Sequence, residues 1–229
     1  MRYTLRYKLA WRLRRYHRLG RLLIAGPYLH TSKLADLVVT DPDYSASQIP
    51  SELAALGEIL RKHRPKSALE IGTLKGGTLL FLTRLASPRA TIVSVDLPDG
   101  NFGGGYGDLR KPQYQRFARL GQHLHLLQGD SHSHATLECV KAAIGDKRLD
   151  YLFIDGDHRY EGVKRDLEMY GPLVRKGGLI ALHDIVDGPT HLVGGVPQFW
   201  REIRSQFRFM EIIKDPSQGG YGIGILYVE

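Results

Sequence analysis

The chain has 229 residues, of which 42% are hydrophobic and 24% charged, as in ordinary globular domains. It contains no apolar run of 18 or more residues and only one cysteine, which excludes a predicted membrane-spanning helix and an internal disulfide bond. The formal net charge of +8 comes from residues 1–35, which hold nine bases and no acid, whereas the other 23 bases are balanced by 24 acids. This distribution argues against nucleic-acid binding across the folded domain and indicates an appended basic element.

Residues 1–49 are predicted to form this element, a basic helical arm that precedes a domain at residues 50–229. The leucines of residues 2–24 share one helical face with arginines around the rest, and Gly26-Pro27 ends the pattern. One interpretation places the arm on an anionic membrane surface. Another packs its leucine face on the domain or on a second subunit, which would give a homo-oligomer. A targeting peptide is a weaker interpretation because no serine precedes Ser32. Leu22–Ala25 is too short for the apolar core of a signal peptide, so we expect a cytoplasmic protein, with membrane contact through the arm alone.

Beyond the arm, the sequence predicts alternating helices and strands. A helix is expected from Ser51, as its N-cap, to about His63, with Glu52 in its first turn. The predicted strands are Ala68–Ile71, Thr91–Val95, Leu124–Gln128, Asp150–Ile154, Leu179–Leu182, Phe209–Ile213 and Tyr221–Val228. The predicted helices between them are Gly76–Leu85, Gln113–Leu120, His134–Ile144, Tyr160–Val174 and Val196–Ser205. This alternation predicts an α/β fold with a mostly parallel seven-stranded sheet, whose last two strands form an antiparallel hairpin at one edge.

Ligands of open α/β sheets bind beyond the carboxyl ends of the strands, so the residues at these ends are the candidate site. The first end reads Glu70-Ile-Gly-Thr-Leu-Lys-Gly-Gly-Thr78. Its spacing matches neither the dinucleotide fingerprint nor a P-loop, and the bland interpretation is a glycine-rich turn. Asp96 ends the next strand, where a carboxylate can accept both hydroxyls of a ribose. Together the two features favour an adenosine-containing ligand. Asp130 and Ser131 follow the third strand and either contact an adenine edge or cap the next helix.

The next two strand ends carry acids and histidines. Phe153-Ile-Asp-Gly-Asp-His158 follows one strand and Ala181-Leu-His-Asp184 the other. Clustered carboxylates repel one another unless a cation lies among them, so we expect Asp155, His183 and Asp184 to hold one divalent metal ion. The alternative is structural, with Asp184 and Asp157 as helix caps and His183 as a core residue.

These motifs, in this order and spacing, resemble class I S-adenosylmethionine-dependent methyltransferases over about residues 50–229. The likeness is to the group of cephalosporin hydroxylase-like proteins and macrolide-sugar O-methyltransferases, and more distantly to catechol and caffeoyl-CoA O-methyltransferases. It implies a Rossmann-like fold and O-methyl transfer to a small-molecule or sugar hydroxyl. It also implies these positions for S-adenosylmethionine: Glu70, Gly72, Thr73, Gly76, Thr78, Asp96, Asp130 and Ser131.

The same resemblance implies Asp155, His183 and Asp184 as the metal ligands and His158 as the general base. Related proteins usually have an acid where His183 stands, so manganese competes with magnesium as the expected cation. Two other functions remain open. One is an oxygenase with an iron site built from His158, His183 and a carboxylate. The other is a non-catalytic membrane-surface protein that retains the fold.

Overall fold

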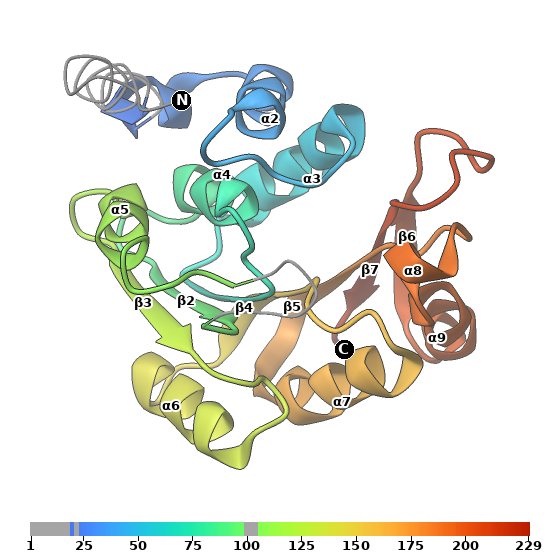
Figure 1. The fold of residues 1–229 in the computed structure, drawn as a ribbon. Helices are drawn as coiled ribbons and strands as arrows, with labels where there is room; N and C mark the ends of the chain where they lie inside the picture. Colours follow the sequence, from blue (N-terminus) through green and yellow to red (C-terminus); the bar gives the residue numbers. More distant parts are fainter. Residues whose placement is uncertain (1–18, 21–22, 99–104) are drawn as a thin grey trace, which may run out of the picture.

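The structure is a computed structural model that describes residues 19–20, 23–98 and 105–229, so most of the predicted arm lies outside the described residues. Its centre is one seven-stranded sheet with the order β3-β2-β1-β4-β5-β7-β6. The strands are β1 (Ser67–Ile71), β2 (Thr91–Asp96), β3 (His123–Gln128), β4 (Leu149–Ile154), β5 (Val174–His183), β6 (Arg208–Ile212) and β7 (Ile223–Tyr227). The predicted α/β, mostly parallel sheet is confirmed (Figure 1).

The first five strands pair in parallel, and the last two form the predicted antiparallel hairpin. β7 pairs antiparallel with both β5 and β6, so it lies between them and β6 becomes the edge strand. The register aligns the carboxyl ends of the central strands, because Ile71 is level with Val95 and Ile154, and Ile154 with Leu182. The residues that follow these four positions therefore start at the same edge of the sheet.

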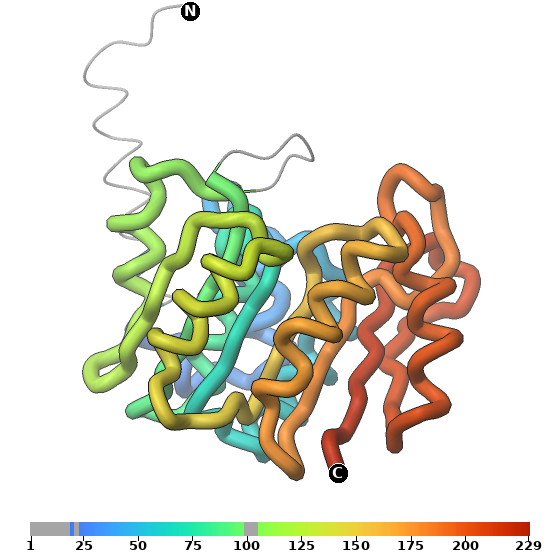
Figure 2. The backbone as a smooth tube through the Cα atoms, turned by 90° about the horizontal axis from the view of Figure 1, so that it is seen from below, coloured from blue at the N-terminus to red at the C-terminus, as the bar shows by residue number. Residues whose placement is uncertain are grey.

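Helices cover both faces of the sheet. They are α2 (Thr31–Thr40), α3 (Pro50–His63), α4 (Gly77–Leu85), α5 (Lys111–Tyr114), α6 (His134–Ile144), α7 (Tyr160–Tyr170), α8 (Thr190–Val193) and α9 (Val196–Ile203). Figure 1 shows α2, α3 and α4 above the sheet and α6 and α7 below it. Figure 2, seen from below, shows α6, α7 and α9 following one another across the lower face. Each face has its own buried cluster, one containing Leu34, Leu53 and Phe81 and the other Val140, Leu167 and Trp200.

Two predicted helices end earlier than expected. The helix predicted for Tyr160–Val174 ends at Tyr170, because Pro172 has no N–H for a further turn, and Val174 already belongs to β5. The helix predicted for Gln113–Leu120 is reduced to α5 and a 3₁₀ turn that ends at Phe117. The pattern of apolar and polar residues thus predicted which elements form better than it predicted the residues at which they end.

The beginning of α3 also differs from the prediction. The helix begins at Pro50 with Ile49 as its N-cap, and no side chain caps it, so the prediction of Ser51 as N-cap is wrong. Proline suits this first position because its missing N–H has no partner in a helix. Glu52 lies in the first turn, as predicted, and is buried, at 1% exposed.

The segment between the predicted arm and α3 packs on the sheet. Leu34, Ala35 and Val38 of α2 are fully buried in the cluster that also contains α3 and α4. No helix among the described residues is both long and apolar enough to cross a membrane. The division of the chain at residue 49 stays a prediction.

Candidate active site

A cavity of about 830 Å³ lies at the carboxyl ends of β1, β2, β4 and β5. It brings together most of the residues predicted from the sequence. The predicted residues that line it are Gly72, Thr73, Thr78, Asp96, Asp130, Ser131, Asp155, His158, His183 and Asp184. Glu70, in β1, and Gly76, in the turn that follows, do not line it. A second cavity, of about 680 Å³, lies at the opposite strand ends, around Lys66, Arg89 and Lys147, and contains none of the predicted residues.

The turn after β1 requires glycine at two positions. Gly72 has a φ of +85°, and a Cβ there would collide with the carbonyl oxygen of Asp155. Its N–H donates to the carbonyl of Val95 at 2.9 Å, so the turn is fixed to both neighbouring strands. Gly76 has a φ of +84° and caps the N-terminus of α4 with no side-chain hydrogen bond. Gly72 therefore brings the backbone to the cavity, whereas Gly76 faces the rings of Tyr114 and Phe117. The close approach of these glycines to a ligand stays a prediction.

Glu70 lies beneath this turn. Its carboxylate accepts a hydrogen bond from Thr73 Oγ1 at 2.8 Å, and its side chain is 1% exposed. Burial raises the pKa of Glu70 to about 8, although hydrogen bonds from Thr78 and Thr73 oppose the shift. Glu70 therefore fixes the side chains of Thr73 and Thr78 by hydrogen bonds and does not itself line the cavity.

Asp96 ends β2 and holds the same turn. Its Oδ2 accepts from the N–H groups of Thr73, at 2.8 Å, and Leu74, at 2.7 Å, and its Oδ1 accepts from Leu97 N–H at 2.7 Å. Burial raises the pKa of Asp96, and these hydrogen bonds oppose the shift. Oδ2 already accepts two hydrogen bonds, which fills its two lone-pair sites, so a ribose hydroxyl would be accepted at Oδ1 while Oδ2 holds the turn.

Asp130 and Ser131 lie at the far side of the cavity, after β3. Asp130 Oδ1 accepts from His132 N–H at 2.9 Å, and Ser131 offers its carbonyl to Tyr170 Oη at 2.7 Å. Neither caps α6, whose N-cap is Ser133 without a side-chain hydrogen bond. The capping alternative is therefore wrong, and both residues face the cavity.

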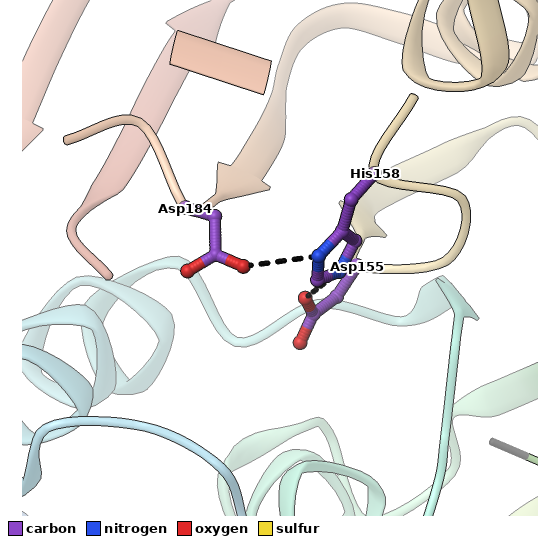
Figure 3. A group of neighbouring side chains, drawn as sticks. All are labelled: Asp155, His158 and Asp184. Carbon is purple, nitrogen blue, oxygen red and sulfur yellow. Dashed lines mark ion pairs between the residues drawn. The ribbon is translucent and has the colours of Figure 1, made fainter. Parts of the chain in front are cut away.

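Asp155, His158 and Asp184 form the most compact polar group in the cavity. Among the described residues, they are the group whose potential metal-ligand atoms all lie within 4.8 Å of one another. Figure 3 shows His158 between the two carboxylates. Its Nε2 lies 3.5 Å from Asp155 Oδ1, and its Nδ1 lies 3.3 Å from Asp184 Oδ2. His158 reaches this position because its Nδ1 donates to the carbonyl of Leu192, at 2.5 Å, in α8.

His183 contacts the same two carboxylates from a buried position. Its Nδ1 is 3.0 Å from Asp155 Oδ1 and 3.5 Å from Asp184 Oδ1. Its Nε2 is buried and has no hydrogen-bond partner. The side chain is 4% exposed, whereas that of His158 is 34% exposed. The structure thus gathers four groups, two carboxylates and two imidazoles, around one point.

The charges in this group depend on one another. Burial favours the neutral form of Asp155, but the neighbouring His183 and His158 outweigh it and lower its pKa to about 2. Burial would lower the pKa of His158, but its hydrogen bond to Asp155 raises it to about 9. Burial raises the pKa of Asp184, and His183 opposes the shift. Protons on the imidazoles therefore balance the carboxylates here, and a divalent cation could take over that role.

Two buried residues of this region were missed by the sequence analysis. Gln48 is 5% exposed and donates from Nε2 to Asp155 Oδ2 at 3.0 Å. No pattern marks it, because it lies in a loop before α3. Glu52 accepts hydrogen bonds from the loop between β6 and β7. Its spacing of four residues from Leu56, and eight from Leu60, places it on the apolar face of α3 and could have revealed its burial.

Comparisons with known proteins identify the family of this fold. Residues 69–185 match the family model described as methyltransferase domain, which is half of the chain. Uncharacterized protein R132 of Acanthamoeba polyphaga mimivirus is 29% identical over 119 residues, which are 52% of this chain and 51% of that protein. The chain therefore spans about half the length of this curated relative.

Solved structures share the fold at low sequence identity. An O-methyltransferase from Bacillus cereus, in complex with SAH, superposes with a TM-score of 0.61 at 18% identity, over 87% of this chain and 89% of that chain. A putative caffeoyl-CoA O-methyltransferase from Staphylococcus aureus gives a TM-score of 0.58 at 15% identity, over 92% and 99%. TomG from Streptomyces achromogenes, in complex with SAM, gives 0.55 at 19% identity, over 87% and 90%.

Proposed function

Because the chain belongs to the methyltransferase domain family, we propose that it transfers a methyl group from S-adenosylmethionine to a hydroxyl oxygen of a small molecule or sugar, with the aid of a divalent cation. The observation that carries this proposal is the composition of one cavity. The glycine turn and Asp96 line one part of it, and two carboxylates with two imidazoles line another. The first part suits an adenosine-containing cofactor and the second a cation with a hydroxyl acceptor. The sequence also resembles macrolide-sugar O-methyltransferases, and this resemblance is the reason that a sugar is included among the proposed acceptors.

The cofactor would be held by the residues of the β1, β2 and β3 ends. Asp96 would accept the ribose hydroxyls, and Asp130 with Ser131 would border the adenine. Gly72 lets the backbone turn at the cavity wall, and Glu70 orients Thr73 and Thr78 from beneath. When bound, S-adenosylmethionine supplies a methyl group on a positively charged sulfur. The Bacillus cereus structure with SAH and the TomG structure with SAM share this fold and support the cofactor.

Asp155, His183 and Asp184 would hold the divalent cation, magnesium or manganese, although the group of potential ligand atoms that lie within 4.8 Å of one another contains His158 in place of His183. The donor set combines two carboxylates with a buried imidazole whose Nδ1 faces both of them. Such a mixed set suits manganese as well as magnesium. When bound, the cation supplies a positive charge that lowers the pKa of an acceptor hydroxyl.

His158 would remove the hydroxyl proton. Its Nδ1 must carry a hydrogen, because a carbonyl oxygen, that of Leu192, only accepts. In the neutral tautomer Nε2 is therefore the atom that can accept a proton. The side chain is one-third exposed in the cavity, whereas that of His183 is buried. His158 can therefore reach an acceptor, and His183 is suited to a fixed ligand.

Calorimetry with SAH, with and without Mn²⁺, tests the cofactor and the cation together. SAH is expected to bind to the wild-type protein, and Asp96→Ala should weaken it, because each lost hydrogen bond to a charged acceptor is worth about 1.5–3 kcal/mol. The acceptor is then sought with S-adenosylmethionine labelled in the methyl group and a panel of diols. Transfer that persists in excess chelator would remove the cation from the proposal. Equal SAH affinity in Asp96→Ala would remove the ribose role of Asp96.

A further inference from the structure

The loop between β6 and β7, residues 213–222, is fastened to α3 by one buried carboxylate. Glu52 Oε1 accepts from Lys214 N–H at 2.9 Å and from Gln218 Nε2 at 2.8 Å. Its Oε2 accepts from Gly222 N–H at 3.1 Å. Glu52 is 1% exposed, so little water competes with these N–H groups for its carboxylate. Glu52 therefore holds both ends of a surface loop.

The same loop is attached to the acid–histidine group of the cavity. Tyr221 donates its N–H to Asp184 Oδ1 at 3.0 Å. Tyr221 and Asp184 both have a φ of +60°, in the left-handed region that side-chain-bearing residues rarely adopt. Strained backbone of this kind persists only where its surroundings hold it, and it is common at functional sites. Glu52 and Asp184 supply part of that restraint through the N–H groups of Gly222 and Tyr221. The N–H groups of Ile185 and Val186 supply the rest through the carbonyls of the same two residues.

The restraint places an aromatic ring beside the proposed acceptor site. The Tyr221 ring lines the cavity, is 37% exposed and lies edge-on to His183, with 6.0 Å between ring centroids. Leu192 of α8 lines the same cavity and is 53% exposed, and its carbonyl accepts from His158. The backbone of each of these two residues thus contacts a residue of the proposed reactive group. The N–H of Tyr221 contacts Asp184, and the carbonyl of Leu192 contacts His158. Exposed apolar groups in a cavity with convergent polar groups are typical of a ligand-binding wall.

We propose that Tyr221 is the specificity-determining residue of the acceptor site, that it selects a hydroxyl acceptor with a flat, ring-bearing face, and that Glu52 is the residue that positions it. This inference rests on the proposed function, because the acceptor is the molecule whose hydroxyl meets His158. The ring of Tyr221 offers an aromatic face to a ring of the acceptor, and Leu192 adds apolar contact. Glu52 acts only through the loop and does not touch the acceptor.

The test for Tyr221 uses 4-nitrocatechol as the acceptor probe, titrated calorimetrically in the presence of Mn²⁺ and SAH. Tyr221→Ala is expected to weaken 4-nitrocatechol about tenfold, and Tyr221→Phe to leave its affinity near the wild-type value, because stacking needs the ring and not the hydroxyl. SAH affinity should be unchanged in both variants. Tyr28→Ala is the matched control, since Tyr28 is 89% exposed and does not line the cavity.

The test for Glu52 uses the same titration and trypsin. In Glu52→Gln an amide NH₂ group replaces one carboxylate oxygen. A donor then faces an N–H donor of the loop, so at least one hydrogen bond that fastens the loop to α3 should be lost. We expect faster cleavage after Lys214 and weaker 4-nitrocatechol binding, with SAH affinity retained. Glu58→Gln, on the same helix, is the control, because Glu58 contacts Thr31 and not the loop. Since Tyr221→Ala changes an exposed side chain, the inference stays testable even if Glu52→Gln fails to fold.

The outcomes separate this inference from the proposed function. A wild-type protein that does not bind SAH would overturn both. SAH binding without 4-nitrocatechol binding would overturn the ring-selective wall and leave the cofactor assignment standing. Equal 4-nitrocatechol affinity in the wild type and Tyr221→Ala would overturn the role of Tyr221. Wild-type affinity and wild-type cleavage in Glu52→Gln would overturn the role of Glu52.

Discussion

The two histidines of the cavity differ in what surrounds them, and this difference agrees with the separate roles proposed for them. His158 is one-third exposed and held by a carbonyl of α8, whereas His183 is buried against Asp155. The resemblance of the sequence implied these two roles, but the residues alone did not show the difference in exposure, because α8 follows both strand ends and its position depends on the fold. The proximity of His158 to Asp184 is therefore a result of tertiary structure.

His158→Ala should lower kcat by about 10²–10⁴-fold if His158 removes the acceptor proton. SAH affinity should be unchanged, because His158 lies apart from the glycine turn. Steady-state kinetics and SAH calorimetry measure the two quantities separately. His134→Ala serves as the control, since His134 is an exposed residue at the beginning of α6. A raised KM with an unchanged kcat would make His158 an acceptor-binding residue instead.

Glu70 makes the stability of the ligand-free protein depend on pH. Burial raises its pKa from 4.5 to about 8, so the native state binds a proton more tightly than the unfolded chain does. The contribution of Glu70 is therefore fully present below pH 4.5 and is lost as the pH rises to about 8. Glu70→Gln cannot ionise. Urea unfolding at several pH values should show wild-type stability falling relative to this variant across that window, and parallel curves would contradict the shifted pKa.

At the level of elements, the strand ends were the most predictable part of the molecule. Apolar runs followed by a polar or glycine residue placed Gly72, Asp96, Asp155 and Asp184 correctly at one sheet edge. Helix ends were less predictable, because Pro172 and not the apolar pattern ends α7. Gln48 was unpredictable for a different reason, since its role depends on one hydrogen bond across 107 residues.

Gly72 is the element-scale test of the turn. Gly72→Ala adds a Cβ at a φ of +85° where the carbonyl of Asp155 leaves no space. We expect the free energy of unfolding to fall by about 2–4 kcal/mol, and SAH binding to weaken with it. Gly145→Ala is a matched control, because Gly145 has a φ of +60° but nothing within 4 Å of an added Cβ. Equal losses of stability in the two variants would show that backbone strain alone, and not the contact with the Asp155 carbonyl, causes the loss.

At the scale of the whole molecule, α2 belongs to the packed core, although the sequence analysis grouped it with the basic arm. Leu34 and Ala35 are fully buried beside α3 and α4. The periodic leucines of residues 2–24 drew attention to the charged segment, and the short helix after Gly26-Pro27 carried no comparable signal. Membrane contact, packing and oligomer contact by residues 1–18 all stay predictions.

Two truncations test this packing. A chain that starts at Asp36 loses Leu34 and Ala35 and should be less stable by at least about 3 kcal/mol, because a buried leucine alone contributes about 1.5–3 kcal/mol and its removal leaves a cavity. A chain that starts at Leu19 retains these contacts. Urea unfolding compares the two. If both are as stable as the full chain, α2 contributes no packing energy. If the chain that starts at Asp36 is destabilised as expected, only the chain that starts at Leu19 is a suitable comparison in flotation with anionic vesicles. The full chain should float at low salt if the arm binds them.

The bonds of Glu52 to the β6–β7 loop span 162 to 170 residues, and this separation affects how the protein is made. A ribosome must synthesise the chain through residue 222 before Glu52 and Asp184 can meet all their loop partners. The part of the cavity formed by the ends of β1 to β3 can assemble earlier in synthesis. Long-range contacts of this kind also slow folding. A nascent chain halted before Tyr221 would therefore have the glycine turn and Asp96 in place, while the wall formed by Tyr221 was still missing.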